Sequence, residues 1–386
     1  MTSIGDPRVW PPASAAEPYA GALHQRAEKS LAAATLSEAG QHSDAIYDSF
    51  RALIEKQDGV ALSKIFESAP SAAIYRHLWR ELARAEAAGD DGAMAMTVFA
   101  LPLTIVAGRE NDDDASATLP CVLSNVSEIA TLLREHGALF GNHTFALANT
   151  LVAADAIDVQ RLPLIYAWRK LDNGSGVDAI PPRDLSPAPI IIDNHDARVH
   201  LRFIVGVAVA ARGIDLVADN GVGKWGMLLT RMLGPALAPH QATVLILPHA
   251  PNRLCVALQQ GRAAQREVSA QLFASGAIRK MRASVGEPVA VVSSHHALDA
   301  PAGGELRLSL SSVFDPAQAE GFRCPLYRAD QTSDVLNMLL ALLQDCRVSD
   351  IRVLPGVHPD CDPTTGLRLL FKAGALGDLP SNVTVQ

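Results

Sequence analysis

Two short stretches of the sequence place carboxylates and imidazoles directly after apolar runs. The first contains Asp193, His195 and Asp196, and the second contains His295 and His296. A strand end fixes a side chain and the loop after it exposes that side chain, which suits metal binding or general-base chemistry. If the two strand ends lie side by side, these five residues could bind a divalent metal, as in a metal-dependent hydrolase. The alternative is that both stretches are solvated turns after buried strands.

The segment 251–282 is locally basic and contains a single acidic residue, Glu267. Its cations are Arg253, Arg262, Arg266, Arg279, Lys280 and Arg282. One interpretation is a helix that contacts RNA, a ribosome or an acidic partner. The interpretation that we favour is a solvated helix face, because Leu272, Phe273 and Ile278 can pack the other side of the same helix.

Other chemistry-bearing motifs are incomplete. A P-loop needs a glycine where Ala218 stands and a hydroxyl residue where Trp225 stands, so we expect an ordinary helix start there. The turn from His358 to Asp362, which includes Cys361, gathers ligand types, but a zinc site needs more ligands at set spacings. No serine lies in a G-x-S-x-G elbow. The sequence therefore predicts no bound cofactor and no metal.

Hydrophobic periodicity predicts an α/β protein of the mixed-sheet (α+β) class. It has a helical N-terminal region and then one or two sandwich-like α/β units. We expect a disordered or extended tail over 1–19, a helical region over 20–92, a first α/β unit over 93–172, a linker over 173–188 and a second α/β unit over 189–386. Some neighbouring strands, such as those on either side of His295, have no helix between them, which favours a mixed sheet over a parallel one.

Several elements carry clear signals. The run 96–101 is rich in strand formers and is expected to end at Pro102. Asn125 is a candidate helix N-cap, and a long helix over 252–282 contains two glycines, Gly261 and Gly276, that can interrupt it. In the strand 306–310, leucines alternate with Arg307 and Ser309, which places those two on the other face.

Two short stretches of the sequence resemble each other. The stretches 97–102 and 243–248 both run from a threonine through apolar residues to a proline. Two related α/β halves would produce this pattern, and so would chance in a chain rich in alanine and leucine. A pseudo-duplication is therefore possible.

Composition excludes some classes of protein. The chain of 386 residues has a formal net charge of −8. A protein that coats nucleic acid or an anionic membrane needs a net positive charge, so both are poor partners for this chain. Its five scattered cysteines form no C-x-x-C pair, which is typical of reduced thiols. We find no signal peptide and no apolar run long enough to span a membrane, so we expect a cytoplasmic protein.

The second half of the chain resembles a proteobacterial family known only as a domain of unknown function. The stretches that carry the resemblance are 261–268, 271–275, 286–292, 304–312, 321–326 and 345–353. The resemblance implies a bacterial cytosolic protein and brings no catalytic residues with it.

These observations favour a non-enzymatic interaction protein, meaning a scaffold, adaptor or regulatory subunit that binds a protein partner or itself. The amphipathic helical region and the lack of a catalytic signature are its basis. The first alternative is the metal-dependent hydrolase built on the 193–196 and 295–296 loops. The second alternative is an RNA- or ribosome-associated factor that uses the basic 251–282 helix.

Overall fold

A computed structural model describes residues 4–15, 17–56, 58–87, 95–109, 117–138, 144–157, 179–180, 189–192, 197–210, 222–237, 242–312, 318–362 and 364–372. The chain divides into two compact units. Unit 1 consists of Met1–Pro11 and Arg266–Gln386, and unit 2 is Pro12–Gln265. The boundary falls inside one helix, so the same helix contributes residues to both units.

The helices are η1 (Ala13–Ala15), α1 (Pro18–Ala32), α2 (Leu36–Lys56), α3 (Gly59–Glu67), α4 (Ala72–Ala87), α5 (Val126–Glu135), η2 (Ala154–Ile157), α7 (Val222–Leu237), α8 (Leu254–Ser284), α9 (Thr332–Asp345) and α10 (Thr365–Lys372). The strands are β1 (Ala95–Arg109), β2 (Ala117–Leu119), β3 (Thr144–Ala148), β4 (Val152–Ala153), β5 (Ala179–Ile180), β6 (Ile190–Ile192), β7 (Arg198–Ala210), β8 (Ala242–Pro248), β9 (Asn252–Arg253), β10 (Pro288–His296), β11 (Gly304–Ser312), β12 (Glu320–Pro325) and β13 (Asp350–His358). This mixture of helices with mixed sheets confirms the predicted fold class.

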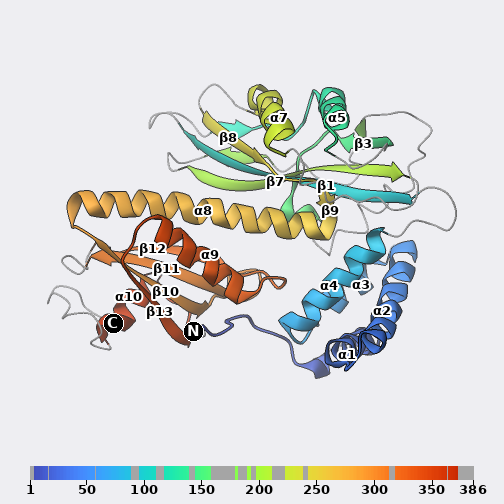
Figure 1. The fold of residues 1–386 in the computed structure, drawn as a ribbon, viewed down its shortest axis with the longest axis horizontal. Coiled ribbons are helices and arrows are strands. Elements are labelled where there is room, and N and C mark those ends of the chain that lie inside the picture. Colours follow the sequence, from blue (N-terminus) through green and yellow to red (C-terminus); the bar gives the residue numbers. More distant parts are fainter. Residues whose placement is uncertain are drawn as a thin grey trace. The chain divides into compact units, whose positions relative to one another are not determined.

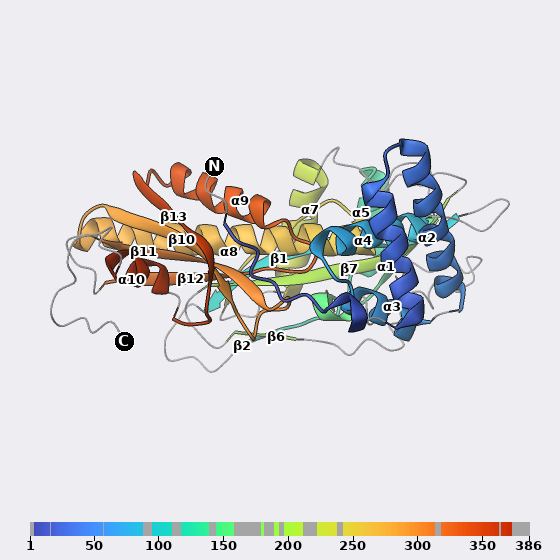
Figure 2. The ribbon, with the colours of Figure 1, turned by 90° about the horizontal axis from the view of Figure 1, so that it is seen from below.

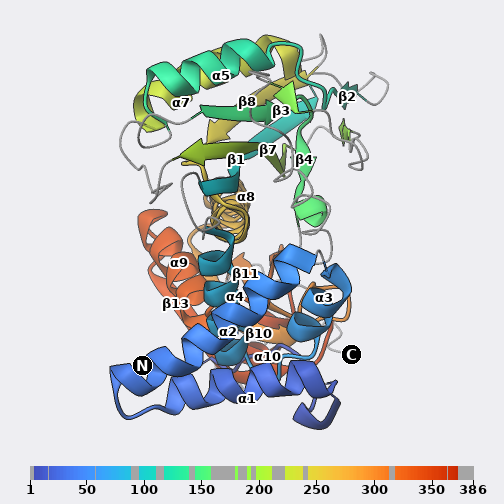
Figure 3. The ribbon, with the colours of Figure 1, turned by 90° about the vertical axis from the view of Figure 1, so that its right-hand side faces the viewer.

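The predicted helical region is present as α1–α4 (Figure 3). Its core contains a group of rings in which Phe66 packs edge-on against both Tyr75 and Trp79. The Trp79 indole also donates a hydrogen bond to the carbonyl oxygen of Cys255, 3.3 Å away. Since Cys255 lies in the first turn of α8, this bond ties α4 to the start of that helix within unit 2.

The main sheet of unit 2 has the strand order β5-β3-β7-β1-β8, with β1 and β7 paired antiparallel over most of their length. Helices α5 and α7 cover one face of it (Figure 1). The apolar faces of both helices and of the central strands form one buried cluster, in which Trp225 of α7 is fully buried.

Strand β1 runs through Pro102, so the prediction that the strand ends there is wrong. The carbonyl oxygen of Pro102 accepts a hydrogen bond from the backbone N–H of His249. The nitrogen of a strand residue points to the same side as its carbonyl. On that side of β1, pairing with β9 extends to Ala100, and pairing with β8 starts at Leu103. The N–H that proline lacks therefore falls in the gap between two partner strands, where the ladder loses nothing.

The division into units also differs from the predicted one. The expected linker over 173–188 separates β1 from β7, but these two strands pair with each other in one sheet. The two similar stretches, 97–102 and 243–248, belong to β1 and β8, which are antiparallel neighbours in that same sheet. They are therefore adjacent strands of one sheet.

Unit 1 contains a four-stranded sheet of order β12-β11-β10-β13. Strand β13 runs parallel to β10 and the other pairs are antiparallel. Helix α9 and the C-terminal part of α8 pack on one face, and α10 packs on the other (Figure 2). Both faces are thus covered, so Arg307 and Ser309 are fully buried beneath α10 and its approach.

Two local expectations about helices are corrected. Neither Gly261 nor Gly276 interrupts α8, which is continuous from Leu254 to Ser284. Asn125 does precede α5, but its side chain makes no capping bond and donates instead to the carbonyl oxygen of Met232.

Candidate functional site

The two adjacent histidines at the end of β10 point to opposite faces of the sheet. Successive side chains of a strand alternate, so His295 shares a face with Ser293 and His296 shares the other with Ser294. Nδ1 of His296 donates to the carbonyl oxygen of Pro7, 2.9 Å away. The pair therefore does not converge on a single ion.

His295 is fully buried and held at both ring nitrogens. Its Nδ1 lies 3.0 Å from the carbonyl oxygen of Pro359, which can only accept, so Nδ1 carries the hydrogen. Nε2 then accepts from the Ser293 hydroxyl at 2.9 Å. Burial, aided by the positive charge of Arg307, lowers the pKa of His295 to about 4, so the ring is neutral near pH 7.

The structure brings the turn after β13 to this histidine. The parallel register places His358 opposite His295, with ring centroids 5.4 Å apart. Among the described residues, Nε2 of His358 is buried and has no hydrogen-bond partner. The exposed Cys361 sulfur lies 3.7 Å from Nδ1 of His295. The 358–362 turn, which the sequence suggested was an isolated loop, is thus one wall of a polar cluster.

Arg307 connects that cluster to the turn through ion pairs and hydrogen bonds. Its guanidinium is fully buried, pairs with Glu305, and lies 2.7 Å from an oxygen of Asp360. It also donates to the backbone carbonyl oxygens of Cys361 and Asp362. Burial alone would lower the pKa of Arg307, but its hydrogen bonds to the two carboxylates raise it. The turn therefore closes over a buried cation.

Asp299, which follows the second histidine stretch in the sequence, is occupied by an ion pair. Its carboxylate accepts hydrogen bonds from both terminal nitrogens of Arg323, and this pairing lowers the pKa of Asp299. Arg323 also reaches Glu305 at 2.9 Å. In the described part of the chain, no three histidine, cysteine or acidic side chains gather as metal ligands. The first candidate stretch, Asp193, His195 and Asp196, lies outside the described residues.

Half of the cations of the basic segment pair with carboxylates of the described residues. Arg266 is buried and makes two bonds to Asp330, the shorter of them 2.6 Å. Lys280 pairs with Glu320 and Arg282 with Glu287. Arg279 is exposed, Arg262 lies on the unit 2 part of α8, and Arg253 belongs to β9, one residue before the helix begins. Three of the six cations therefore form ion pairs within unit 1, and of these three only Arg266 is buried.

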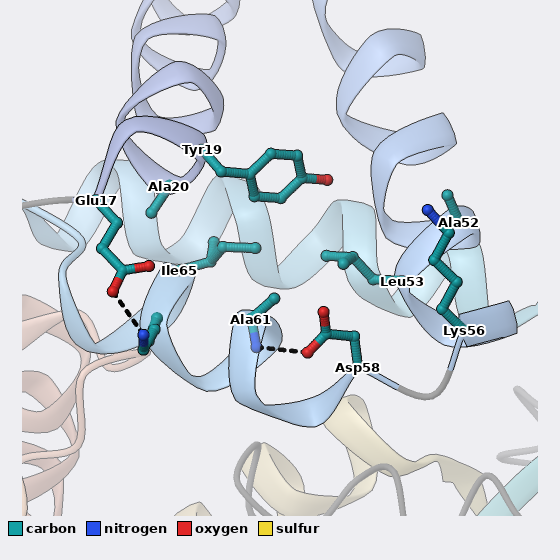
Figure 4. A pocket seen from close by; sticks show the side chains of 10 residues that line it. Glu17, Tyr19, Ala20, Ala52, Leu53, Lys56, Asp58, Ala61 and Ile65 are labelled. Carbon is teal, nitrogen blue, oxygen red and sulfur yellow. Dashed lines mark hydrogen bonds and ion pairs between the residues drawn. The ribbon is translucent and has the colours of Figure 1, made fainter.

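A pocket opens in the helical region of unit 2, where the first turns of α1 and α3 meet the end of α2 (Figure 4). It has a volume of about 350 Å³. It is lined by Glu17, Tyr19, Ala20, Ala52, Leu53, Lys56, Asp58, Ala61, Lys64 and Ile65. The Tyr19 ring stands in it and is 47% exposed, although the sequence placed this residue in the tail. The helix begins at Pro18, a residue that suits a first helical position.

The polar groups of the pocket are partly occupied. Glu17 pairs with Lys64, and Asp58 caps α3 by accepting from the N–H of Ala61 at 3.0 Å. Lys56 is exposed and forms no ion pair with another described residue. Two acidic and two basic side chains balance in charge, so the lining selects neither anions nor cations. What it offers is an apolar floor with a polar rim.

No family model matches the chain, and neither the curated proteins nor the solved structures contain a significant match to it. Among the described helices, none has the length and apolar character needed to cross a membrane. The residues of the candidate sites therefore carry the functional inference alone.

Proposed function

We propose that this chain is an interaction protein of the bacterial cytoplasm, a scaffold, adaptor or regulatory subunit, that binds a protein partner through its helical region. The observation that supports the proposal is the open pocket beside Tyr19, whose volume of about 350 Å³ lies within the ~300–1,000 Å³ usual for binding pockets.

The chemistry of the lining favours an apolar anchor side chain from the partner. Buried Leu53 and Ile65 form part of the floor, and an apolar group placed on them gains about 25 cal/mol per Å² of surface removed from water. Tyrosine is among the residues enriched where binding energy concentrates at protein interfaces, and Tyr19 is half exposed here. The rim side chains Lys56 and Asp58 can bond to the backbone of a bound segment.

Selection of a displayed random-peptide library on the purified protein tests this proposal. We expect enriched peptides to share a large apolar residue and to lose binding when the pocket is filled by Ala61→Trp. The matched control is Ala32→Trp, which adds the same side chain at an exposed site at the end of α1. Peptides that bind both variants equally, or no enrichment at all, would contradict the assignment.

A further inference from the structure

The first residues of the chain pack onto its C-terminal unit. Met1–Pro11 group with Arg266–Gln386, although residues 12–265 separate them in sequence. Ile4 forms a parallel bridge to Gly356, and the Val9 N–H donates to the carbonyl oxygen of Ala302 at 3.2 Å. We call residues 4–10 the strap. The sequence predicted a disordered or extended tail here, and the strap is extended and bound.

Two side chains of β10 donate hydrogen bonds to the backbone of the strap. The Ser294 hydroxyl donates to the carbonyl oxygen of Gly5 at 2.7 Å, and Nδ1 of His296 donates to that of Pro7 at 2.9 Å. Pro7 has no N–H to satisfy, so its burial against the unit leaves no orphaned donor. These bonds recognise an extended backbone.

Arg8 adds side-chain specificity. Its side chain is 2% exposed, and Nη1 donates to the carbonyl oxygens of Tyr327, Arg328 and Asp330, at 3.0, 3.2 and 2.6 Å. The carboxylate of Asp6, also in the strap, accepts from Nε at 2.8 Å. A buried guanidinium needs such a ring of acceptors, and lysine could not supply the same planar set of donors. Unit 1 thus contains a built arginine pocket.

Gly304 leaves room for the strap. A Cβ atom at this position would lie 2.7 Å from the carbonyl carbon of Pro7 and 2.8 Å from its Cγ, closer than real Cβ atoms approach. The neighbouring Gly303 has a φ of +73°, which favours glycine, and its position faces Val9. A single methyl group at position 304 would therefore push the strap away.

Apart from the Asp6–Arg8 pair within the strap, every contact described above joins the strap to the 266–386 part of unit 1, and none depends on which molecule supplies the strap. We propose that unit 1 carries a binding site for an extended Ile-Gly-Asp-Pro-Arg-Val-Trp segment, and that a second copy of this chain can fill it with its own strap. Exchange of an identical element is a common route to dimers, and backbone pairing of an extended segment is a common mode of peptide recognition.

A labelled peptide of residues 1–14 tests the site. In the full-length protein the attached strap competes at a high effective concentration, whereas Arg8→Ala weakens that competitor and leaves the site intact. We expect the Arg8→Ala protein to bind the peptide at least about tenfold more tightly than the wild type does, measured by fluorescence anisotropy. An exposed Arg279→Ala variant serves as the control and should match the wild type.

Two results would contradict the proposed binding site. The first is a folded Arg8→Ala protein that does not bind the wild-type peptide. The second is an Arg8→Ala protein that binds the wild-type peptide and a peptide carrying Arg8→Ala equally well. If Arg8→Ala does not fold, the milder Asp6→Ala variant, which removes only the partner of Arg8 within the strap, is titrated with the same peptide and judged by the same criteria.

Complementary variants test the exchange between copies. The Arg8→Ala chain has an intact site and a weak strap, whereas the Gly304→Ala chain has an intact strap and a blocked site. We expect each to be monomeric alone and their mixture to form a one-to-one dimer in size-exclusion chromatography with light scattering. A mixture that stays monomeric while the peptide binds would overturn the exchange and leave only the intramolecular role of the site.

Discussion

His295 of β10 and His358 of β13 stand opposite each other across a parallel strand pair, and their rings lie 5.4 Å apart. The first ring is neutral and fully bonded, and the second keeps one buried nitrogen without a partner among the described residues. Together with Cys361 and the buried Arg307 they form a polar cluster inside a well-packed unit. The cluster is held by hydrogen bonds and ion pairs.

Replacing Arg307 should destabilise the protein strongly. The substitution Arg307→Met leaves buried Glu305 with a single cationic partner and frees the carbonyl oxygens of the 360–362 turn. Breaking a buried ion pair typically costs about 3 kcal/mol or more. Denaturant unfolding should show this loss, while Arg279→Met, at an exposed site, should change the free energy of unfolding by less than about 0.5 kcal/mol. Similar stabilities for the two variants would refute the structural role of Arg307.

Arg307→Lys should fail to restore stability even though it keeps the charge. The native guanidinium bonds to two carboxylates and to backbone carbonyls from three different nitrogens, and an ammonium group is a point donor without that fork. We expect its unfolding midpoint to lie nearer to that of Arg307→Met than to that of the wild type. A lysine variant as stable as the wild type would show that charge alone is required.

Stability should fall as the pH drops from about 6.5 to about 4. Burial lowers the pKa of His295 and of His77 from 6.5 to about 4, so over this range the unfolded chain binds protons that the folded chain does not. The free energy of unfolding must then decrease with decreasing pH in this window, and these two histidines contribute no further pH dependence above it. Thermal midpoints of a His295→Gln variant should decline less steeply than those of the wild type, and parallel profiles would contradict the assignment.

The two glycines of α8 should respond to alanine in opposite ways. A Cβ at Gly276 meets nothing within 4 Å, so Gly276→Ala should stabilise the helix by about 1 kcal/mol. A Cβ at Gly261 lies 2.8 Å from Leu201 and 3.0 Å from Phe203, both buried in β7, so Gly261→Ala should destabilise by about 1 kcal/mol or more. Chemical denaturation of this matched pair measures both effects, and equal shifts would argue against the close packing at Gly261.

Cys361 should be the first thiol to react with an aromatic disulfide reagent under native conditions. It is exposed, whereas Cys121, Cys255 and Cys324 are buried, and burial raises the pKa of Cys324 to about 12. A fast phase of about one equivalent should therefore vanish in Cys361→Ser. Persistence of that phase would place the reactive thiol elsewhere, with half-buried Cys346 the next to examine.

Local patterns in the sequence predicted the elements well. Ile74, Leu78 and Leu82 recur every fourth residue in the sequence, and all three are buried in α4. Leu306, Leu308 and Leu310 alternate with polar residues, and they form the face of β11 that lies in the main cluster of unit 1. Periodicity reports burial on one side of an element, and these elements bury that side. The mixed sheet and the helical start of the chain were predictable for the same reason.

Pairing between distant segments was decided by the tertiary structure alone. No local pattern shows that β1 pairs with β7, that His295 meets the 358–362 turn, or that residues 4–10 belong with the last third of the chain. Arg307 illustrates the physical reason: its place in an alternating strand fixes the face on which it lies, but only the packing of α10 and of the 358–362 turn decides that this face is buried. Sequence periodicity encodes the orientation of a side chain within its element, whereas its surroundings depend on contacts between residues that are far apart in the chain.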